Sequence, residues 1–382
     1  MSEAISMNDA GVNPRTESEA LSNVTPRWIH NLALITCCVT FVLICMGGVV
    51  KSKQAGLSVP DWPQSYGHPT IEVAGTAAGL TALLTVAWIF TRIPALAIAA
   101  IVAGFALDVI YVTMGPSIGD TPWYLIESVR AEHSHRLVAG NVGFLYFILT
   151  GALWTTEKRR KVRSLALWGV LAIVCQAVLG GLTVRMQLPP LVSALHGSLA
   201  QGFFIITIVL AYLTSPIWFE KRELLPQNDA KPFQKLAKML VIAFYVQIVL
   251  GTAVRHTNYG GGQGNESSFY WHTGAHLAGL LWVLHNIAKV TLRVARKHWE
   301  VKALSGPVKV LLCLVTTQVG LGIGILIYRL LTKLDGNPVA LKEIVATSHV
   351  GIGALCLATS VYLTLQAHRV LEPEASKSGA AA

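Results

Sequence analysis

The sequence predicts an all-α, polytopic membrane protein built from two similar helical halves, and three observations support this. The chain of 382 residues is 53% hydrophobic and only 13% charged, with a mean hydropathy of +0.54. Its apolar residues fall in runs long enough to cross a bilayer, which takes about 20 residues. A short glutamine-containing motif also recurs along the chain, as an internal repeat would. A large soluble bundle is disfavoured, because soluble helices keep a polar face.

Ten apolar stretches are candidate membrane-spanning helices. They lie near 29–50, 73–90, 93–114, 129–153, 164–184, 191–214, 236–255, 270–288, 304–328 and 344–366. The second and third are interrupted by Arg92 and Pro94, and are expected to form an extra transmembrane hairpin over 73–114. The other eight divide into an N-terminal half, 29–214, and a C-terminal half, 236–368, joined by a cytosolic linker at 215–235. Residues 1–28 and 369–382 are expected to be cytosolic tails.

The loops predict how the chain is oriented. Basic residues crowd the "TTEKRRKVRS" loop and the segments 214–235 and 289–302, which the positive-inside rule places in the cytosol. This distribution accounts for the net charge of +10 without a nucleic-acid partner. The six cysteines all lie inside apolar stretches, so no disulfide framework is expected.

The repeated motif precedes a set of histidines. "QAVLGG" begins at Gln176, "QIVLGT" at Gln247 and "QVGLGI" at Gln318, each near the outer end of an outgoing helix. Four helices run from the outside to the inside, and each carries a histidine five to seven residues past its start. At that position the histidine lies about 8–10 Å below the external boundary. These histidines are His135, His196, His276 and His349.

Four imidazoles at one depth, two in each half, suit two haem irons. Ionisable residues inside a membrane usually mark function, and neutral imidazole is a good axial ligand for haem. A zinc ion would require further ligands nearby. His272 shares a helix face with His276 and is the alternative third ligand. Glycines near these positions would let a flat porphyrin approach, or would only permit close helix packing: Gly140, Gly143, Gly197, Gly274, Gly279, Gly351 and Gly353.

A single glutamate distinguishes the halves. Glu132 stands three residues before His135, where it could accept protons or stabilise positive charge on a porphyrin substituent. The alternative is an ion pair with Arg136 or Arg130. Thr273 occupies the corresponding place before the third histidine. One haem would therefore be chemically modified as a substrate, and the other would relay electrons. The candidates for propionate contacts, which could equally reach lipid phosphates, are Arg136, Arg185 and Arg255.

These motifs resemble those of the haem A synthase family. "EHSHR" matches the family's E-x-x-H-R signature through Glu132, His135 and Arg136. "GGVVKSKQAGLSVPDWPQSYG" is similar to the family's first helix end and first external loop, and "QAVLGGLTV" with "LHGSLAQGFF" to its second histidine region. The resemblance covers roughly 28–72 and 120–368.

The resemblance implies an oxidoreductase that converts the methyl group of haem O to the formyl group of haem A. A substrate haem O would be held by His135 and His196, and a haem b cofactor by His276 and His349. The implied setting is a bacterial cytoplasmic membrane with both termini inside. Haem O synthase, cytochrome oxidase assembly factors and an unidentified electron acceptor would be its partners.

Two other functions stay open from the residues alone. A di-haem b-type cytochrome that only transfers electrons between quinol and a partner would explain the histidines but leave Glu132 without a role. A transporter is suggested by the two-half repeat, although its polar residues would be expected at the membrane midplane.

Overall fold

The computed structural model is almost entirely helical. It describes residues 25–67, 95, 99, 102, 117, 118, 121–220, 227–257, 266–331 and 339–370. Within these residues, eight helices are long and apolar enough to cross a membrane, which confirms the predicted all-α polytopic class. They are α2 (Arg27–Ser52), α5 (Glu127–Thr156), α6 (Arg160–Arg185), α7 (Pro190–Thr214), α9 (Gln227–Thr257), α10 (Glu266–Lys297), α11 (Lys302–Leu331) and α12 (Val339–Val370).

The helices extend beyond the apolar stretches that predicted them. A short helix α8 (Pro216–Phe219) and the start of α9 both lie in the segment expected to be a linker. Hydropathy identifies the part of a helix that can lie in hydrocarbon, whereas polar residues can continue the same helix beyond it. The hairpin expected over 73–114, apart from three isolated positions, lies outside the described residues, as do most of the two expected tails.

Proline and left-handed residues mark several helix ends. Pro26 precedes α2, and Pro190 opens α7, where the missing amide hydrogen costs nothing because first-turn amides have no helical acceptor. Just after α6, Gln187 and Leu188 adopt φ values of +57° and +60°, which a continuing right-handed helix cannot accept. The chain therefore turns sharply between α6 and α7.

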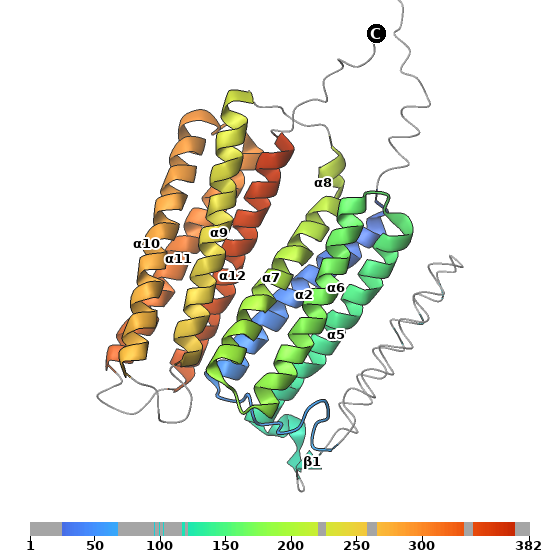
Figure 1. Ribbon diagram of the computed structural model, residues 1–382, viewed down its shortest axis with the longest axis vertical. Helices are drawn as coiled ribbons and strands as arrows, with labels where there is room; N and C mark the ends of the chain where they lie inside the picture. Colours follow the sequence, from blue (N-terminus) through green and yellow to red (C-terminus); the bar gives the residue numbers. More distant parts are fainter. Residues whose placement is uncertain are drawn as a thin grey trace, which may run out of the picture.

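The eight helices form two four-helix bundles that lie side by side (Figure 1). The N-terminal half contains α2, α5, α6 and α7, and the C-terminal half contains α9 to α12. Helices α2 and α7 pack against α9 and α12 and so form the interface between the halves. We call the end at which α2 and α6 finish and α5 and α7 begin the histidine end; it is the lower end in Figure 1.

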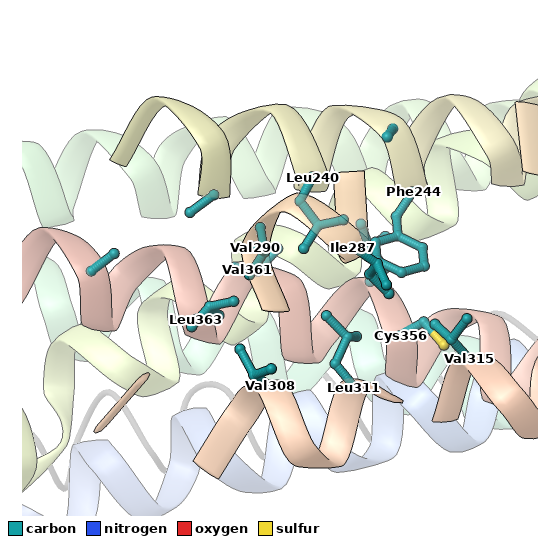
Figure 2. Close-up of a cluster of buried hydrophobic side chains, with 14 of the residues drawn as sticks. Leu240, Phe244, Ile287, Val290, Val308, Leu311, Val315, Cys356, Val361 and Leu363 are labelled. Carbon is teal, nitrogen blue, oxygen red and sulfur yellow. The ribbon is translucent and has the colours of Figure 1, made fainter. Parts of the chain in front are cut away.

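Apolar side chains fill the middle of each half. The cluster in the C-terminal half includes Leu240, Ile287 and Leu311 (Figure 2), and it continues across the interface to Ile44 of α2 and Phe204 of α7. The N-terminal half has its own cluster, centred on side chains of α5 such as the fully buried Tyr146, Leu149 and Leu153. The two halves therefore share one continuous packed interface.

Large apolar side chains are also exposed on the outer helix faces, as lipid contact requires. On α6 these include Leu167, Trp168 and Leu171. In water such a surface would be a strong aggregation hazard, whereas in a bilayer it meets hydrocarbon chains.

A small folded segment leads into α5 at the histidine end. Strand β1 (Ser117–Ile118) pairs antiparallel with β2 (Thr121–Pro122), and the short helix η1 (Trp123–Leu125) follows. Trp123 is buried against Val59 and Val129, which joins this segment to the loop that follows α2. This segment and the loop after α2 thus lie together at the histidine end of the N-terminal half, and we call the two together the cover.

Candidate functional site

One contact recurs in four successive helix pairs, in which a glycine on the first helix faces a histidine on the second. In every pair, a Cβ atom built on the glycine would lie 3.0–3.2 Å from Cε1 of the imidazole. Such a distance is shorter than nine in ten real Cβ contacts, so any other residue would require the ring to shift by a few tenths of an ångström. The pairs are Gly47 with His135, Gly180 with His196, Gly251 with His276, and Gly322 with His349.

A glutamine completes three of these four contacts. It stands four residues before the glycine, so that it lies on the same helix face one turn away. Its amide nitrogen is 3.2–3.5 Å from Nε2 of the facing imidazole in the pairs Gln176–His196, Gln247–His276 and Gln318–His349. In the first two pairs this nitrogen also donates to the histidine's own carbonyl oxygen at 3.0 Å. The repeated glutamine found in the sequence therefore serves the histidine of the next helix.

The four histidines are distributed two to each half. His135 lies on α5 and His196 on α7, whereas His276 lies on α10 and His349 on α12. The arrangement of the two rings of each half around one iron stays a prediction.

The residues around each pair fit an iron porphyrin. Every one of the four rings has a buried Nδ1 atom without a hydrogen-bond partner. A buried nitrogen in that state is costly unless a ligand satisfies the ring. Among the described residues, no group of three or more His, Cys, Asp or Glu side chains is placed to hold a metal ion.

Glu132 is buried beside the first pair and is fully occupied by hydrogen bonds. Only 4% of its surface is exposed. Its Oε2 accepts from the backbone amide of Val59 at 2.8 Å, and its Oε1 pairs with Nη2 of Arg136 at 2.5 Å. The ion pair with Arg136, which was the alternative prediction for Glu132, is therefore present. Glu132 also has a partner that the sequence did not suggest, the loop after α2.

Arg136 holds that loop through several carbonyl oxygens. Its guanidinium donates to Val59 and Asp61 at 2.7 Å each, and to Gln64 at 3.2 Å. Four hydrogen bonds, counting that to Glu132, leave this side chain engaged by protein groups. The role expected for Arg136 as a propionate contact stays a prediction.

The loop at 55–67 is itself rigidly built. Burial alone would raise the pKa of Asp61, but its carboxylate accepts hydrogen bonds from the amides of Gly67 and Tyr66, and the net pKa is lowered. The Tyr66 hydroxyl donates to the carbonyl of Ser58. The Trp62 indole lies over Gly181 of α6, where any Cβ atom would come within 2.7 Å of the ring. The loop is thus fastened to both α5 and α6, the helices on either side of the first site.

Two cations link the halves at the histidine end. Arg255, on α9, donates to the carbonyl of Gly48 at 2.7 Å and to the hydroxyl of Ser52 at 2.8 Å, both on α2. Lys53 bridges Glu127 of α5 and Glu343 of α12 at 2.5 and 2.8 Å. These hydrogen bonds raise the pKa of Lys53 above its ordinary value. The propionate role expected for Arg255, and for the exposed Arg185 at the end of α6, stays a prediction.

The geometry favours His276 over His272 as the histidine of the third pair. The ring of His272 turns back on its own helix, with Nδ1 2.6 Å from the carbonyl oxygen of Ser268. His276 instead faces Gly251 and the second glutamine. His133, another histidine of the same motif as His135, is buried edge-on against Trp123 and belongs to the cover rather than to a pair.

Sequence reasoning missed the Trp62–Gly181 contact and the glycine beneath each histidine. The glycine beneath a histidine has a signal in hindsight at three of the four contacts, where it stands four residues after the repeated glutamine. The contact of Trp62 has no such signal, since it joins segments that are more than 100 residues apart.

Comparisons with known proteins identify the family of this chain. Residues 128–335, more than half of the chain, match the COX15-CtaA family model, described as a cytochrome oxidase assembly protein. A protein named heme A synthase from Shewanella oneidensis is 26% identical over 361 residues, covering 87% of this chain and 94% of the relative.

Two further relatives carry the same name. The protein from Rhizorhabdus wittichii is 24% identical over 366 residues, covering 88% of this chain and 93% of its own. The protein from Shouchella clausii is 33% identical over 135 residues, covering 33% of this chain and 42% of its own. The resemblance first inferred from the motifs is thereby confirmed.

Proposed function

The chain belongs to the COX15-CtaA family of cytochrome oxidase assembly proteins, and from that premise we propose that it is a haem A synthase. It would oxidise the methyl group of haem O to the formyl group of haem A. Two groups of observations support the assignment: the two glycine-facing histidines of each half, and the relatives named heme A synthase that cover most of the chain.

We assign different roles to the two haem sites because, among the described residues, only one site has a buried carboxylate three residues before a histidine. Glu132 stands three residues before His135, whereas the corresponding places before the other histidines hold Ser193, Thr273 and Ala346. We therefore assign the substrate haem O to His135 and His196. The haem b cofactor is assigned to His276 and His349, and it supplies a path for electrons when bound.

The reaction needs a base and an outlet for electrons. Oxidising a methyl group to a formyl group with one water releases four protons and four electrons. Glu132 is the group placed to take up protons at this site, or to stabilise positive charge that develops on the substituent. Its Oε1 and Oε2 are fixed by Arg136 and the Val59 amide, so the carboxylate is oriented before the substrate binds. Arg136, Arg185 and Arg255 are the proposed contacts for propionates.

The loop at 55–67 would exclude water from this chemistry. It is pinned to α5 through Glu132 and Arg136 and to α6 through Trp62. A closed cover strengthens electrostatic interactions beneath it, because fewer water molecules screen them. The C-terminal haem, which only passes electrons, would not require such a cover.

The proposed setting is a bacterial cytoplasmic membrane, with both termini in the cytosol and the histidine end outside. Haem O synthase would deliver the substrate, and assembly factors of cytochrome oxidase would receive the product. Electrons would leave to an acceptor in or beside the membrane.

Pigment analysis tests the proposed function directly. The chain is expressed in cells that make haem O but lack their own haem A synthase, and the haems are extracted and separated. We expect haem A or its hydroxylated precursor. Full haem loading with neither product would reject the proposal.

A di-haem b-type cytochrome is the second candidate, because the structural bonds of Glu132 offer a complete role for it without catalysis. It would move electrons between quinol and a partner. If quinol reduced both haems rapidly and no modified haem ever appeared, this reading would replace the first.

A further inference from the structure

Two corresponding helix junctions join the halves. In each, a helix that carries a histidine packs against a glycine-bearing helix of the opposite half: α7 against α9, and α12 against α2. The residue two places after the histidine and the residue one place after the glycine meet the opposite helix. These residues are Ser198 and Thr252 at the first junction, but Gly351 and Gly48 at the second.

The junction between α7 and α9 is built from hydroxyl groups. The hydroxyl oxygens of Ser198 and Thr252 lie 3.0 Å apart, so that one donates to the other. Tyr245, about two turns earlier on α9, donates its hydroxyl to the backbone carbonyl oxygen of Ser198 at 3.2 Å. Ser198 is only 8% exposed. Helix α9 of the C-terminal half therefore holds α7 through both the side chain and the backbone of one residue.

The corresponding positions between α2 and α12 carry no such bond. A Cβ atom built on Gly48 would lie 3.4 Å from the methyl group of Thr347, and one built on Gly351 would lie 3.1 Å from Sγ of Cys45. Close approach of the backbones joins the helices here, as small residues allow in membranes. The hydroxyl groups of Ser52 and Thr347, 3.3 Å apart, link these two helices one turn nearer the histidine end.

The hydroxyl contact bears on the direction of the His196 ring. Two residues correspond to about 200° of rotation around an α-helix, so His196 faces Gly180 of α6 while Ser198 faces α9. Hydrogen bonds are directional, and bonds on one side of a helix limit its rotation about its own axis. The direction of the ring on the other side is limited with it.

We propose that Thr252 and Tyr245, which belong to the C-terminal half, are positioning residues for His196 of the N-terminal site. The two sites are thereby assembled together: the site proposed to take haem O is complete only when the half proposed to relay electrons is packed against it. This inference rests on the proposed function, because it requires that both sites hold haem and that the N-terminal site takes the substrate.

Electron paramagnetic resonance is the measurement, because the signal of an oxidised haem with two histidine ligands depends on the orientation of the imidazole rings. The full-length protein is purified in detergent with haem b in both sites. His349→Ala, which should lack the C-terminal haem, identifies the N-terminal signal. Thr252→Val keeps the shape of the side chain but removes its hydroxyl. We expect it to shift the N-terminal signal and to leave the C-terminal signal in place, although Thr252 belongs to the C-terminal half.

The rate of haem loss gives a second readout. Haem b should pass from the N-terminal site of Thr252→Val to apomyoglobin about threefold faster than from the wild-type protein, which is the effect of one hydrogen bond between membrane helices. Thr252→Ser retains the hydroxyl and should restore the wild-type signal and rate.

Two further variants complete the test. Thr316→Val is the matched control, because Thr316 is exposed on α11 and donates to the carbonyl of Leu312 in its own helix. Both haem signals should stay unchanged in this control. Tyr245→Phe removes only the bond to the Ser198 carbonyl and should shift the N-terminal signal. It keeps the inference testable even if Thr252→Val fails to take up haem.

Three results would overturn the inference. They are equal shifts of both haem signals in Thr252→Val, an unshifted N-terminal signal in both Thr252→Val and Tyr245→Phe, or a Thr252→Ser protein that behaves like Thr252→Val. The proposed function fails separately: the expected shifts, with no haem A in the pigment extract, would reject methyl oxidation alone.

Discussion

The two halves hold their histidines in the same way but surround them differently. In each half, two histidines on returning helices lie over glycines of the preceding helices. The C-terminal half adds a glutamine to both contacts. The N-terminal half replaces one glutamine by Leu43 and adds Glu132, Arg136 and the loop at 55–67.

The missing glutamine is confined to one helix pair, α2 with α5, although the loop at 55–67 also contacts α6 through Trp62. The pair α6 with α7 keeps the glutamine and the glycine, as do both pairs of the C-terminal half. A repeated scaffold can therefore acquire a new role through changes at one of its four contacts. The histidines identify what the scaffold binds, and the altered contact identifies where chemistry is proposed to occur.

Removing a histidine of the C-terminal half should have the largest effect. His276→Ala should lose one of two haems and abolish haem A formation, because the N-terminal site then has no outlet for electrons. His272→Ala, four residues away on the same helix, should keep both haems. Haem content per protein, measured after extraction, checks both variants. Loss of a haem from the His272 variant would contradict the assignment of His276.

Replacing one carboxylate with an amide in each half, at Glu132 and at Glu343, should distinguish a catalytic role of Glu132 from a structural one. Glu132→Gln should lower haem A formation about 100-fold, the usual contribution of a positioned proton acceptor, without lowering haem content. Glu343→Gln is the matched control, since Glu343 is also a hydrogen-bonded carboxylate at the histidine end, on α12. Product yield and haem content are measured together. Equal yields from the two variants would assign Glu132 a structural role only.

The histidines at one depth could be predicted because the depth of a residue in the membrane follows from its number of residues from the start of the helix. A ring five to seven residues into a helix has a defined distance from the boundary, and four such rings share it. The glutamine repeat was also visible, but its purpose was not. Spacing along one helix carries no information about which residue of the next helix it faces.

The cover over the N-terminal site could not be predicted, for a physical reason. Glu132 binds a backbone amide of Val59, and Arg136 binds three carbonyl oxygens. Every residue except proline has the same backbone N–H and C=O groups. A hydrogen bond to the backbone therefore cannot be predicted from residue types. Only the ion pair between two side chains could be proposed beforehand, and it is present.

Loosening the cover should destabilise the protein, with the first effect at the loop 55–67. Arg136→Met removes four hydrogen bonds and leaves the buried Glu132 without its cation, which should cost about 3 kcal/mol. Thermal unfolding in detergent measures the loss, and faster proteolysis within 55–67 should accompany it. Arg130→Met is the control, because Arg130 is exposed and donates to the carbonyl of Tyr124 on the surface. Similar losses in both variants would mean that the loop is not held through Arg136.

Filling the space beneath one histidine should affect that site and no other. A Cβ at Gly322 would lie 3.2 Å from the ring of His349, whereas one at Gly324 would lie 3.8 Å from Val345, an ordinary contact. Gly322→Ala should therefore shift the absorption bands of one haem and destabilise the protein by about 1 kcal/mol. Gly324→Ala should leave the spectrum unchanged. Identical spectra for the two variants would argue against the glycine contact.

The smallest expected effect concerns Lys53, which joins the halves through Glu127 and Glu343. Hydrogen bonds to these two carboxylates raise the pKa of Lys53 above its ordinary 10.5. Its contribution to stability is therefore complete below about pH 10.5 and is lost as the pH rises through the higher, folded-state pKa. Because the side chain is 25% exposed, we expect at most about 1 kcal/mol. The measurement is the difference in thermal midpoint between wild type and Lys53→Met. The effects of all other lysines are the same in both proteins and cancel in this difference. That difference should stay constant up to about pH 10.5 and shrink above it. A gap that stays constant or widens would mean that the halves are held together at this end by packing and Arg255 rather than by the charge of Lys53.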